Sequence, residues 1–367
     1  MRCARSSSRY ALPVNDDRRM NRFRVGISQG VRTAAGEMVI PEFDLSPLDD
    51  DSRIECVSLP DTARLDAQTA AGLDAVILML EAVTEETFDG SGRLTLIARF
   101  GVGYDRIDVQ ACTSNAVALA ITPGGVRRPV AVSVITLMLA LTSRLMTKDR
   151  IAREGPAGWA RKAQYNGFGL VGRTLGSLGM GNIGVEVFKL VQPFDMRLIA
   201  HDPYANAGTA AALGVTLVSL EQLFRESDIL SVSCPLNETT RGIVDAPMLD
   251  LMKPSAFLIN TSRGAVVDQA ALLATLQAKR IAGAGLDVLA QEPPDEDDAI
   301  LSLDNVILSP HALCWTDQCM AGNGAADVAA VQAVMNGRPP AHVVNSAVLE
   351  SPEIKKRLNE YAKQFGH

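Results

Sequence analysis

The sequence predicts an α/β fold of two lobes, each built on a doubly wound parallel sheet. The chain has 367 residues, which is more than one hydrophobic core usually holds. Short, continuous apolar runs alternate with helical stretches, as is typical of parallel sheets that are buried on both faces. Hydrophobic residues make up 47% and aromatic residues 5%, so we expect aliphatic cores rather than aromatic ones.

Apolar runs in the first third of the chain predict the strands of the first lobe. Gly, Asp or Pro residues separate these runs, which cover 23–28, 53–59, 73–80, 94–101 and 116–123. The TPGG stretch at 122–125 then predicts a hinge. A long helix is expected after it over 127–145, because Pro129 is tolerated in a first helical turn.

A second alternating series predicts the other lobe. Its strand-like runs cover 173–179, 197–203, 216–220, 228–236, 256–262, 282–289 and 305–311. Helical stretches lie between them, which favours a second doubly wound sheet. Another helical run is expected after Asn323, and the chain could return through it to the first lobe.

The first nineteen residues differ in composition from the rest. They are rich in Arg and Ser and contain no acidic residue before Asp16. Either they form a transit peptide, or they lie upstream of a true start at Met20. We favour the second interpretation and expect this segment to be disordered in either case.

Charge and cysteine content exclude several classes of partner. The net charge is −7 and the pI about 5.3, which argues against a nucleic-acid partner, although one positioned arginine could still bind a small anion. The six cysteines form no CxxC pair, so we expect no metal site, reduced thiols and a cytoplasmic location. The longest apolar run, 130–141, is too short for a membrane span and predicts a buried helix.

A glycine-rich stretch predicts a dinucleotide site. Gly179, Gly181 and Gly184 form a G-x-G-x-x-G pattern with Asn182 and Ile183, between a strand-like run and a helix-like run. The first glycine would permit a tight turn, the second a close approach of a pyrophosphate, and the third close helix–strand packing. The helix N-terminus would offer free N–H groups to phosphates, so the unit is typical of a Rossmann fold.

An acidic residue follows at the spacing expected for a ribose contact. Asp202 ends the next strand-like run, 23 residues beyond Gly179. Its carboxylate would accept hydrogen bonds from the adenosine ribose and repel a 2′-phosphate. The cofactor is therefore expected to be NAD rather than NADP.

Three polar residues follow strands at the expected carboxyl edge of the second sheet. They are Arg263 in NTSRGAVVD, Glu292 in GLDVLAQEPP and His311 in SPHALCWT. Hydride transfer to a carbonyl needs a proton donor, and histidine suits this role near neutral pH. A carboxylate orients such a histidine and favours its charged form, while a guanidinium can bind a substrate carboxylate. The trio predicts an oxidoreductase site.

The chain resembles the D-isomer-specific 2-hydroxyacid dehydrogenases from about residue 98 to residue 345. The resemblance depends on several motifs in the family's order, namely GVGYDRID, ITPGG, LGMGNIG, Asp202 at its strand end, NTSRGAVVD, GLDVLAQEPP and SPHALCWT. It implies two similar α/β lobes, Rossmann-like and flavodoxin-like, with the NAD-binding domain inserted into the substrate-binding domain. It also implies interconversion of a small D-2-hydroxy acid and its 2-oxo acid.

The resemblance assigns roles to individual residues. It implies that Arg263 binds the substrate carboxylate and keto group, and that His311 is the general acid and base, with Glu292 as its partner. The backbone of Val102 and Gly103 would hold the substrate carboxylate.

Further residues are implied on the cofactor side. Asp287 would contact the nicotinamide end, while Thr261, Cys234 and Pro235 would line the cofactor cleft. Because members are commonly dimers, a homodimer is expected.

The expected domain boundaries combine the strand pattern with this resemblance. They are an extension at 1–19, the first part of the substrate-binding domain at 20–123, the NAD-binding domain at 124–308, a return segment of the substrate-binding domain at 309–345 and a tail at 346–367.

The sequence departs from the family pattern at two places. Val132 stands where relatives often have glutamate in the long helix, and Asn182 replaces an arginine of the glycine loop, which removes a phosphate contact. Two alternatives to the 2-hydroxy acid reaction stay open. One is a formate or phosphite dehydrogenase on the same fold, and the other is a non-enzymatic, NAD-sensing corepressor. The side chain of the substrate and the physiological direction are not determined by the sequence.

Overall fold

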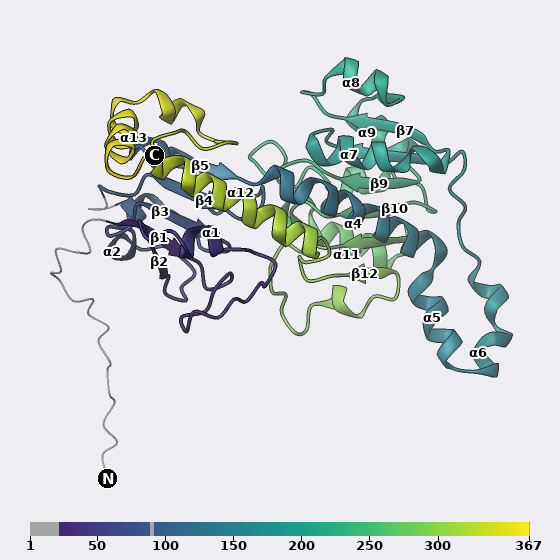
Figure 1. Cartoon of the computed structure of the whole chain (residues 1–367). Helices are drawn as coiled ribbons and strands as arrows, with labels where there is room; N and C mark the ends of the chain where they lie inside the picture. The colour runs from purple at the N-terminus through teal and green to yellow at the C-terminus, as the bar shows by residue number, and fades with distance from the viewer. Residues whose placement is uncertain (1–21, 89–91, 367) are drawn as a thin grey trace, which may run out of the picture. The chain divides into compact units, whose positions relative to one another are not determined.

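A computed structural model describes residues 22–88 and 92–366, and Figure 1 shows it as a ribbon. The extension expected at 1–19 and the candidate start at Met20 lie outside these residues. Packing divides the described chain into two compact units. Unit 1 holds the described residues up to 100 together with 106–120 and 327–366, and unit 2 holds 101–105 and 121–326. The sequence pattern placed the equivalent boundaries at 124 and 309.

Unit 1 is a five-stranded sheet with short helices. Its elements are β1 (Phe23–Ile27), α1 (Ser46–Asp49), β2 (Ile54–Ser58), α2 (Ala67–Ala70), β3 (Ala75–Leu78), β4 (Leu96–Arg99), α3 (Val109–Ser114), β5 (Ala118–Ile121) and α13 (Pro352–Phe365). The strand order is β2-β1-β3-β4-β5, in which β1 pairs in parallel with β2 and β3, and β3 with β4. This is the flavodoxin-like order of a doubly wound sheet, the kind of lobe that the family resemblance implied.

The C-terminal helix α13 belongs to the core of unit 1. Ile354, Leu358, Tyr361 and Phe365 are its buried residues, and the Tyr361 and Phe365 rings both meet the ring of Phe23 in β1 edge to face. The spacing of four, three and four residues places these side chains on one helical face. The segment expected only as a tail is therefore a packed element.

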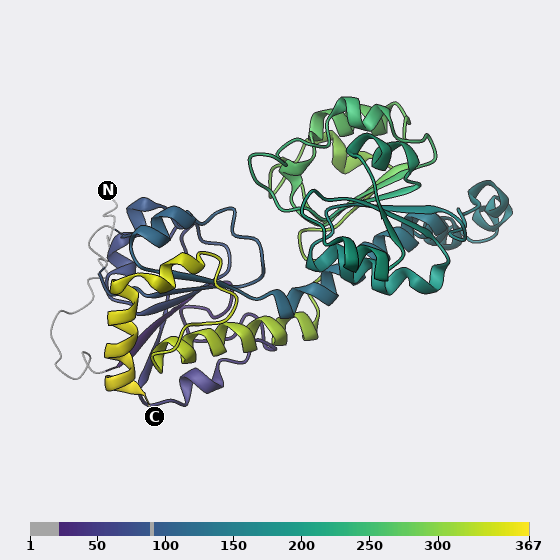
Figure 2. The same ribbon diagram turned by 90° about the horizontal axis from the view of Figure 1, so that it is seen from above.

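Unit 2 is a seven-stranded parallel sheet with helices on both faces, as Figure 2 shows. Its elements are α4 (Pro123–Ser143), α5 (Leu145–Arg153), α6 (Pro156–Ala160), β6 (Thr174–Leu178), α7 (Asn182–Val191), β7 (Arg197–His201), α8 (Ala207–Ala212), β8 (Val215–Leu217), α9 (Leu220–Glu226), β9 (Ile229–Val232), α10 (Ala246–Asp250), β10 (Phe257–Asn260), α11 (Gln269–Gln277), β11 (Gly283–Leu286) and β12 (Val306–Leu308). Helix α12 (Asp317–Met335) begins in unit 2 and continues into unit 1.

The strand order of unit 2 places ligands at one edge. The order is β12-β11-β10-β9-β6-β7-β8, and it reverses between β6 and β9. In open α/β sheets, ligands bind beyond the carboxyl ends of the strands at such a reversal. The glycine-rich stretch follows β6 directly, so the fold positions it at this switch point.

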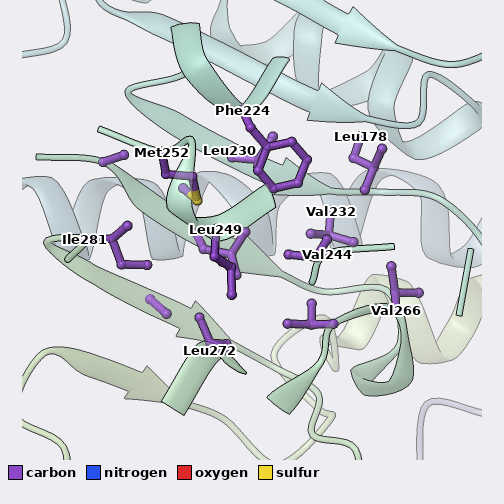
Figure 3. Close-up of a cluster of buried hydrophobic side chains, with 14 of the residues drawn as sticks. Leu178, Phe224, Leu230, Val232, Val244, Leu249, Met252, Val266, Leu272 and Ile281 are labelled. Carbon is purple, nitrogen blue, oxygen red and sulfur yellow. The ribbon is translucent and has the colours of Figure 1, made fainter. Parts of the chain in front are cut away.

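Two aliphatic cores cover the two faces of this sheet. One lies beneath α9, α10 and α11 and contains Phe224, Leu249 and Leu272, as Figure 3 shows. The other lies beneath α4 and α7 and contains Leu137 and Phe188. The strands contribute alternate residues to each core, which explains why their sequences are apolar without a polar alternation.

Helix α4 begins earlier than the sequence predicted. The TPGG stretch, expected as a hinge before a helix at 127, is the N-cap and first turn of α4. Pro123 stands at the first helical position, where a missing N–H costs nothing. A Cβ on Gly125 would lie 2.6 Å from the Asn323 backbone nitrogen, so glycine lets α12 approach closely. Although α4 is long and apolar enough to cross a membrane, its packing is that of a core helix of unit 2.

Candidate active site

The glycine loop of unit 2 has the geometry of a phosphate-binding turn. Gly179 has a φ of +98°, and a Cβ there would lie 2.8 Å from the backbone nitrogen of Cys234. A Cβ on Gly184 would lie 2.6 Å from the Gly179 carbonyl oxygen. Gly181, in contrast, faces open space and is the N-cap of α7, whose first residue is Asn182. Two glycines are therefore required for packing, and the third leaves room for a ligand.

The carboxylate of Asp202 lies against this loop. Its Oδ2 accepts a hydrogen bond from the Met180 N–H at 2.8 Å, and its Oδ1 accepts one from the Tyr204 N–H at 2.8 Å. These bonds fix the carboxylate beside the glycine turn, while its remaining lone pairs can accept from ribose hydroxyls. An open Gly181, the helix N-terminus and a fixed acid together fit a dinucleotide such as NAD.

The other residues expected on the cofactor side are placed in two groups. The Cys234 backbone packs on Gly179, and Pro235 beside it is exposed. Burial raises the pKa of the Cys234 thiol to about 11, so this side chain is a neutral wall residue. Thr261 is half-buried and follows β10 directly, and Ile183 packs against the core beneath α4 and α7. The structure thus brings Cys234 to the glycine loop, whereas Thr261 lies at the end of β10, two residues before Arg263.

His311 and Glu292 form a hydrogen-bonded pair. The Nδ1 atom of His311 lies 2.7 Å from Oε2 of Glu292, and both side chains are partly exposed. The other carboxylate oxygen, Oε1, accepts a hydrogen bond from the Leu289 N–H at 2.9 Å. The ring nitrogen Nε2 is thereby left to serve a ligand. This is the arrangement of an oriented general acid and base.

Asp287 holds the loop that carries His311. Its side chain is only 4% exposed, and Oδ1 accepts hydrogen bonds from the Ser309 hydroxyl at 2.6 Å and from the N–H groups of Ala312 and Leu313 at 3.1 Å. These bonds stabilise the left-handed backbone of His311, whose φ is +54°. The structure therefore shows a loop-holding role for Asp287, beyond the nicotinamide contact that the family resemblance implied.

A buried asparagine at the end of β10 presents Arg263. Asn260 is 1% exposed, and its Oδ1 accepts hydrogen bonds from both the N–H and the hydroxyl of Ser262. Its Nδ2 donates to the Arg263 carbonyl oxygen at 3.0 Å. The sequence interpretation missed Asn260, although a polar residue that ends an apolar strand was a usable signal.

The 101–105 loop packs against the arginine within unit 2. A Cβ on Gly103 would overlap the Arg263 guanidinium, so only glycine leaves the arginine its position. Arg263 Nε also donates to Asp105 Oδ1 at 2.6 Å, a contact that the sequence interpretation did not foresee. Val102 lies between Gly103 and Gly101, which has a φ of +95°. The loop thus places backbone groups beside the guanidinium.

Electrostatics keep Glu292 charged. Burial alone would raise the pKa of this carboxyl. The hydrogen bonds from His311 and the Leu289 N–H, with the charges of His311 and Arg263, outweigh burial and hold its pKa below the usual value. Glu292 is therefore a carboxylate throughout the neutral range, as a partner of a protonated imidazole must be.

Metal binding and thiol chemistry are two further kinds of chemistry to consider near this pair. Across residues 22–88 and 92–366, no group of three or more His, Cys, Asp or Glu side chains could hold a metal ion. Cys314 and Cys319 are free thiols that share a hydrogen bond. This hydrogen bond and burial raise the pKa of Cys314 far above its usual value, while the same hydrogen bond lowers the pKa of Cys319. The arrangement can support proton transfer by the imidazole, with the charge of Arg263 near its carboxylate partner.

Comparison with known proteins identifies similar chains. The family model described as "D-isomer specific 2-hydroxyacid dehydrogenase, NAD binding domain" matches residues 135–312. A glyoxylate reductase of Korarchaeum cryptofilum is 34% identical over 316 residues, which cover 85% of this chain and 95% of that protein. A D-3-phosphoglycerate dehydrogenase of Archaeoglobus fulgidus is 33% identical over 273 residues, but the match covers 74% of this chain and only 51% of that protein.

A solved structure agrees with the observed architecture. An NADPH-dependent glyoxylate/hydroxypyruvate reductase from Sinorhizobium meliloti, in complex with citrate, is 27% identical and has a TM-score of 0.74. The likeness covers 88% of this chain and 98% of that one.

Proposed function

Because the chain belongs to the D-isomer-specific 2-hydroxyacid dehydrogenases, which are NAD-dependent oxidoreductases, we propose that Arg263, Glu292 and His311 interconvert a small D-2-hydroxy acid and its 2-oxo acid. The observation that carries this proposal is the His311–Glu292 pair. Its Nδ1–Oε2 distance of 2.7 Å orients an imidazole at the carboxyl edge of the unit 2 sheet.

His311 handles the proton. In reduction, Nε2 donates a proton to the carbonyl oxygen of the 2-oxo acid as that oxygen gains charge, and the C2–H bond forms with the hydride that NADH supplies. In oxidation, the same nitrogen accepts the hydroxyl proton. Glu292 stays ionised, fixes the ring through Nδ1 and stabilises the imidazolium form.

Arg263 and the 101–105 loop handle the substrate anion. The planar guanidinium can bind a carboxylate oxygen and the neighbouring carbonyl oxygen together, which fixes the reacting carbon and polarises the carbonyl. Gly103 packs against the guanidinium, and in this proposal the backbone of Val102 and Gly103 holds the far carboxylate oxygen.

Asp202 supports a preference for NAD over NADP. Its carboxylate is fixed by two backbone N–H groups beside the glycine loop, so it would repel a 2′-phosphate. Because the relative from Sinorhizobium meliloti is NADPH-dependent, the cofactor preference of this chain has to be measured with both cofactors. We expect NADH to be used with the higher kcat/KM.

The names of the relatives indicate which oxo acids to examine first. The chain is 34% identical to the glyoxylate reductase of Korarchaeum cryptofilum and 27% identical to the glyoxylate/hydroxypyruvate reductase of Sinorhizobium meliloti. We therefore propose glyoxylate and hydroxypyruvate as the first substrates to examine.

A substrate panel tests the proposed function. NADH absorbance would be followed with glyoxylate, hydroxypyruvate, pyruvate, a branched-chain oxo acid, phenylpyruvate and 3-phosphohydroxypyruvate, and repeated with NADPH. We expect turnover of at least one unphosphorylated acid with NADH. Absence of turnover across the panel, with formate or phosphite oxidised instead, would replace this function with that of a dehydrogenase for a smaller anion.

We further propose that the protein acts as a homodimer in the cytoplasm, without nucleic acid or membrane as partner. The support for the dimer is a set of exposed apolar side chains in α4, α5 and α6 and in the segment after α6, all in unit 2. They are Val132, Leu139, Leu145, Met146, Trp159 and Val171. A groove of about 550 Å³ that includes Leu139 and Phe168 adjoins them. Figure 1 shows α5 and α6 extending beyond the sheet of unit 2, where a second copy could cover them.

A further inference from the structure

Two of the five N–H groups of Arg263 are already used inside unit 2. Nε donates to Asp105 Oδ1 at 2.6 Å, and Nη1 donates to the Ser262 carbonyl oxygen at 2.7 Å. A guanidinium carries one N–H on Nε and two on each Nη atom. Three N–H groups remain, one on Nη1 and two on Nη2, and these two nitrogens together can bind two oxygens of a planar anion.

The contact with Asp105 joins two distant parts of the chain. Asp105 ends the loop that contains Val102 and Gly103, whereas Arg263 follows β10, 158 residues later. Within unit 2, this ion pair therefore ties the expected carboxylate-binding loop to the expected carboxylate-binding side chain. The hydrogen bond to Asp105 comes from Nε, so this bond uses neither of the Nη nitrogens.

We propose that Asp105 is a positioning residue for the 2-oxo acid reaction, an inference that rests on the proposed function. Its carboxylate holds the guanidinium through Nε, so that the Nη1–Nη2 edge faces the substrate. An arginine side chain has many rotamers, and holding it in one orientation before binding lowers the entropic cost of binding a substrate anion. Asp105 also places a negative charge behind the guanidinium, away from its anion-binding edge.

A surface ion pair without a role in the reaction is the competing explanation. Both side chains are partly exposed, at 23% for Arg263 and 32% for Asp105, and such pairs contribute little to stability. The two explanations therefore make the same prediction for thermal unfolding. They differ in kinetics, because only the loss of a positioning residue raises KM for the oxo acid while the dissociation constant of NADH stays unchanged.

The experiment compares wild-type protein with Asp105→Asn, Asp105→Ala and the control Asp304→Ala. Asp304 forms an ion pair of the same kind with Arg150 at 3.1 Å, on the surface of unit 2 and away from the site. Kinetic constants for glyoxylate and hydroxypyruvate would be measured with saturating NADH. The dissociation constant of NADH would be measured separately by its fluorescence, and the unfolding temperature by circular dichroism.

We expect Asp105→Ala to lower kcat/KM for the oxo acid by about 10- to 100-fold, mainly through a higher KM, with NADH affinity and unfolding temperature unchanged. Asp105→Asn keeps an oxygen that can accept from Nε, so it should recover part of this loss. Asp304→Ala should behave as wild type.

Two results would overturn the inference. If both Asp105 variants match Asp304→Ala while the wild type turns over oxo acids, Asp105 is an ordinary surface residue and the proposed function stands. If the wild type turns over none of the panel, the proposed function fails and this inference fails with it.

Discussion

At the scale of single residues, the site depends on small side chains and fixed loops as much as on its charged groups. Gly103 lies beneath the Arg263 guanidinium, and Gly264 packs directly on the backbone of Leu289 and Ala290. The contact of Gly264 joins the turn after β10, which carries Arg263, to the segment that leads to Glu292. Geometry of this precision explains why substitutions outside the acid–base pair should alter turnover.

Gly103→Ala should lower kcat/KM by about tenfold or more, because the new methyl group displaces the guanidinium. The control is Gly124→Ala in the first turn of α4, where an added Cβ meets nothing within 4 Å. Steady-state kinetics of both variants test this. Equal activities would show that Arg263 can move without consequence.

Glu292→Gln should shift the pH dependence of the reaction. The pKa of Glu292 is held low, so the residue is charged at neutral pH and favours the protonated imidazole. Reduction needs that protonated form, so removal of the charge should make reduction decline at a lower pH than in wild type. Profiles of kcat/KM from pH 5 to 9 measure this shift, and a profile that keeps its wild-type position would contradict the role of Glu292.

At the scale of elements, the sequence predicted the strands better than the helix ends. Every strand expected from an apolar run is present, because continuous apolar sequence leaves few alternatives to a buried strand. The predicted start of α4 was four residues too late. Gly124 and Gly125 indicate a break in the sequence, but Gly125 is required inside the helix because α12 packs against it.

Contacts between distant segments were also beyond the sequence. The His311–Glu292 pair could be expected because both residues lie in motifs that accompany each other. The Asp105–Arg263 pair could not, because many acidic residues were available and only the packed loop selects one. Asn260 was missed for a different reason. A polar residue at the end of an apolar strand was visible in the sequence, but its hydrogen bonds to Ser262 and Arg263 depend on the shape of the turn.

Helix α12 contains a buried acid with a predictable effect on stability. Asp327 is 1% exposed, and its Oδ2 has no hydrogen-bond partner within the part of the chain that the structure describes. Burial raises the pKa of Asp327 well above its ordinary value, with a partial opposing effect from the charge of Arg99. The free energy of unfolding is therefore highest at low pH, where Asp327 is neutral, and it falls as the pH rises through the raised pKa.

Asp327→Asn should flatten this dependence and raise the unfolding temperature at pH 8 relative to wild type, since an amide does not ionise. Thermal unfolding followed by circular dichroism between pH 5 and 9 measures it. The control is Asp304→Asn, whose side chain is 86% exposed and which should follow wild type. If Asp327→Asn keeps the wild-type dependence of the unfolding temperature on pH, Asp327 is not the cause of that dependence.

At the scale of the whole molecule, the proposed dimer can be tested at the exposed apolar side chains of unit 2. Leu145 and Met146 are neighbours in α5 and are 54% and 59% exposed, and adjacent exposed apolar side chains are typical of an interface. The double variant Leu145→Glu/Met146→Glu should convert a dimer into a monomer of 39.1 kDa. Light scattering after size exclusion tests this, with Leu217→Glu on β8 as control. A wild-type mass of one chain would contradict the proposed dimer.

The measurement that tests the central claim most directly compares His311→Asn with wild type in NADH-dependent reduction of the best oxo acid. NADH binding would be measured in parallel, and His342→Asn, another exposed histidine, would serve as control. The account predicts a loss of kcat of at least about 100-fold for His311→Asn, with NADH affinity retained and the control fully active. Full activity of His311→Asn would contradict the assignment of His311 as the acid and base of the reaction.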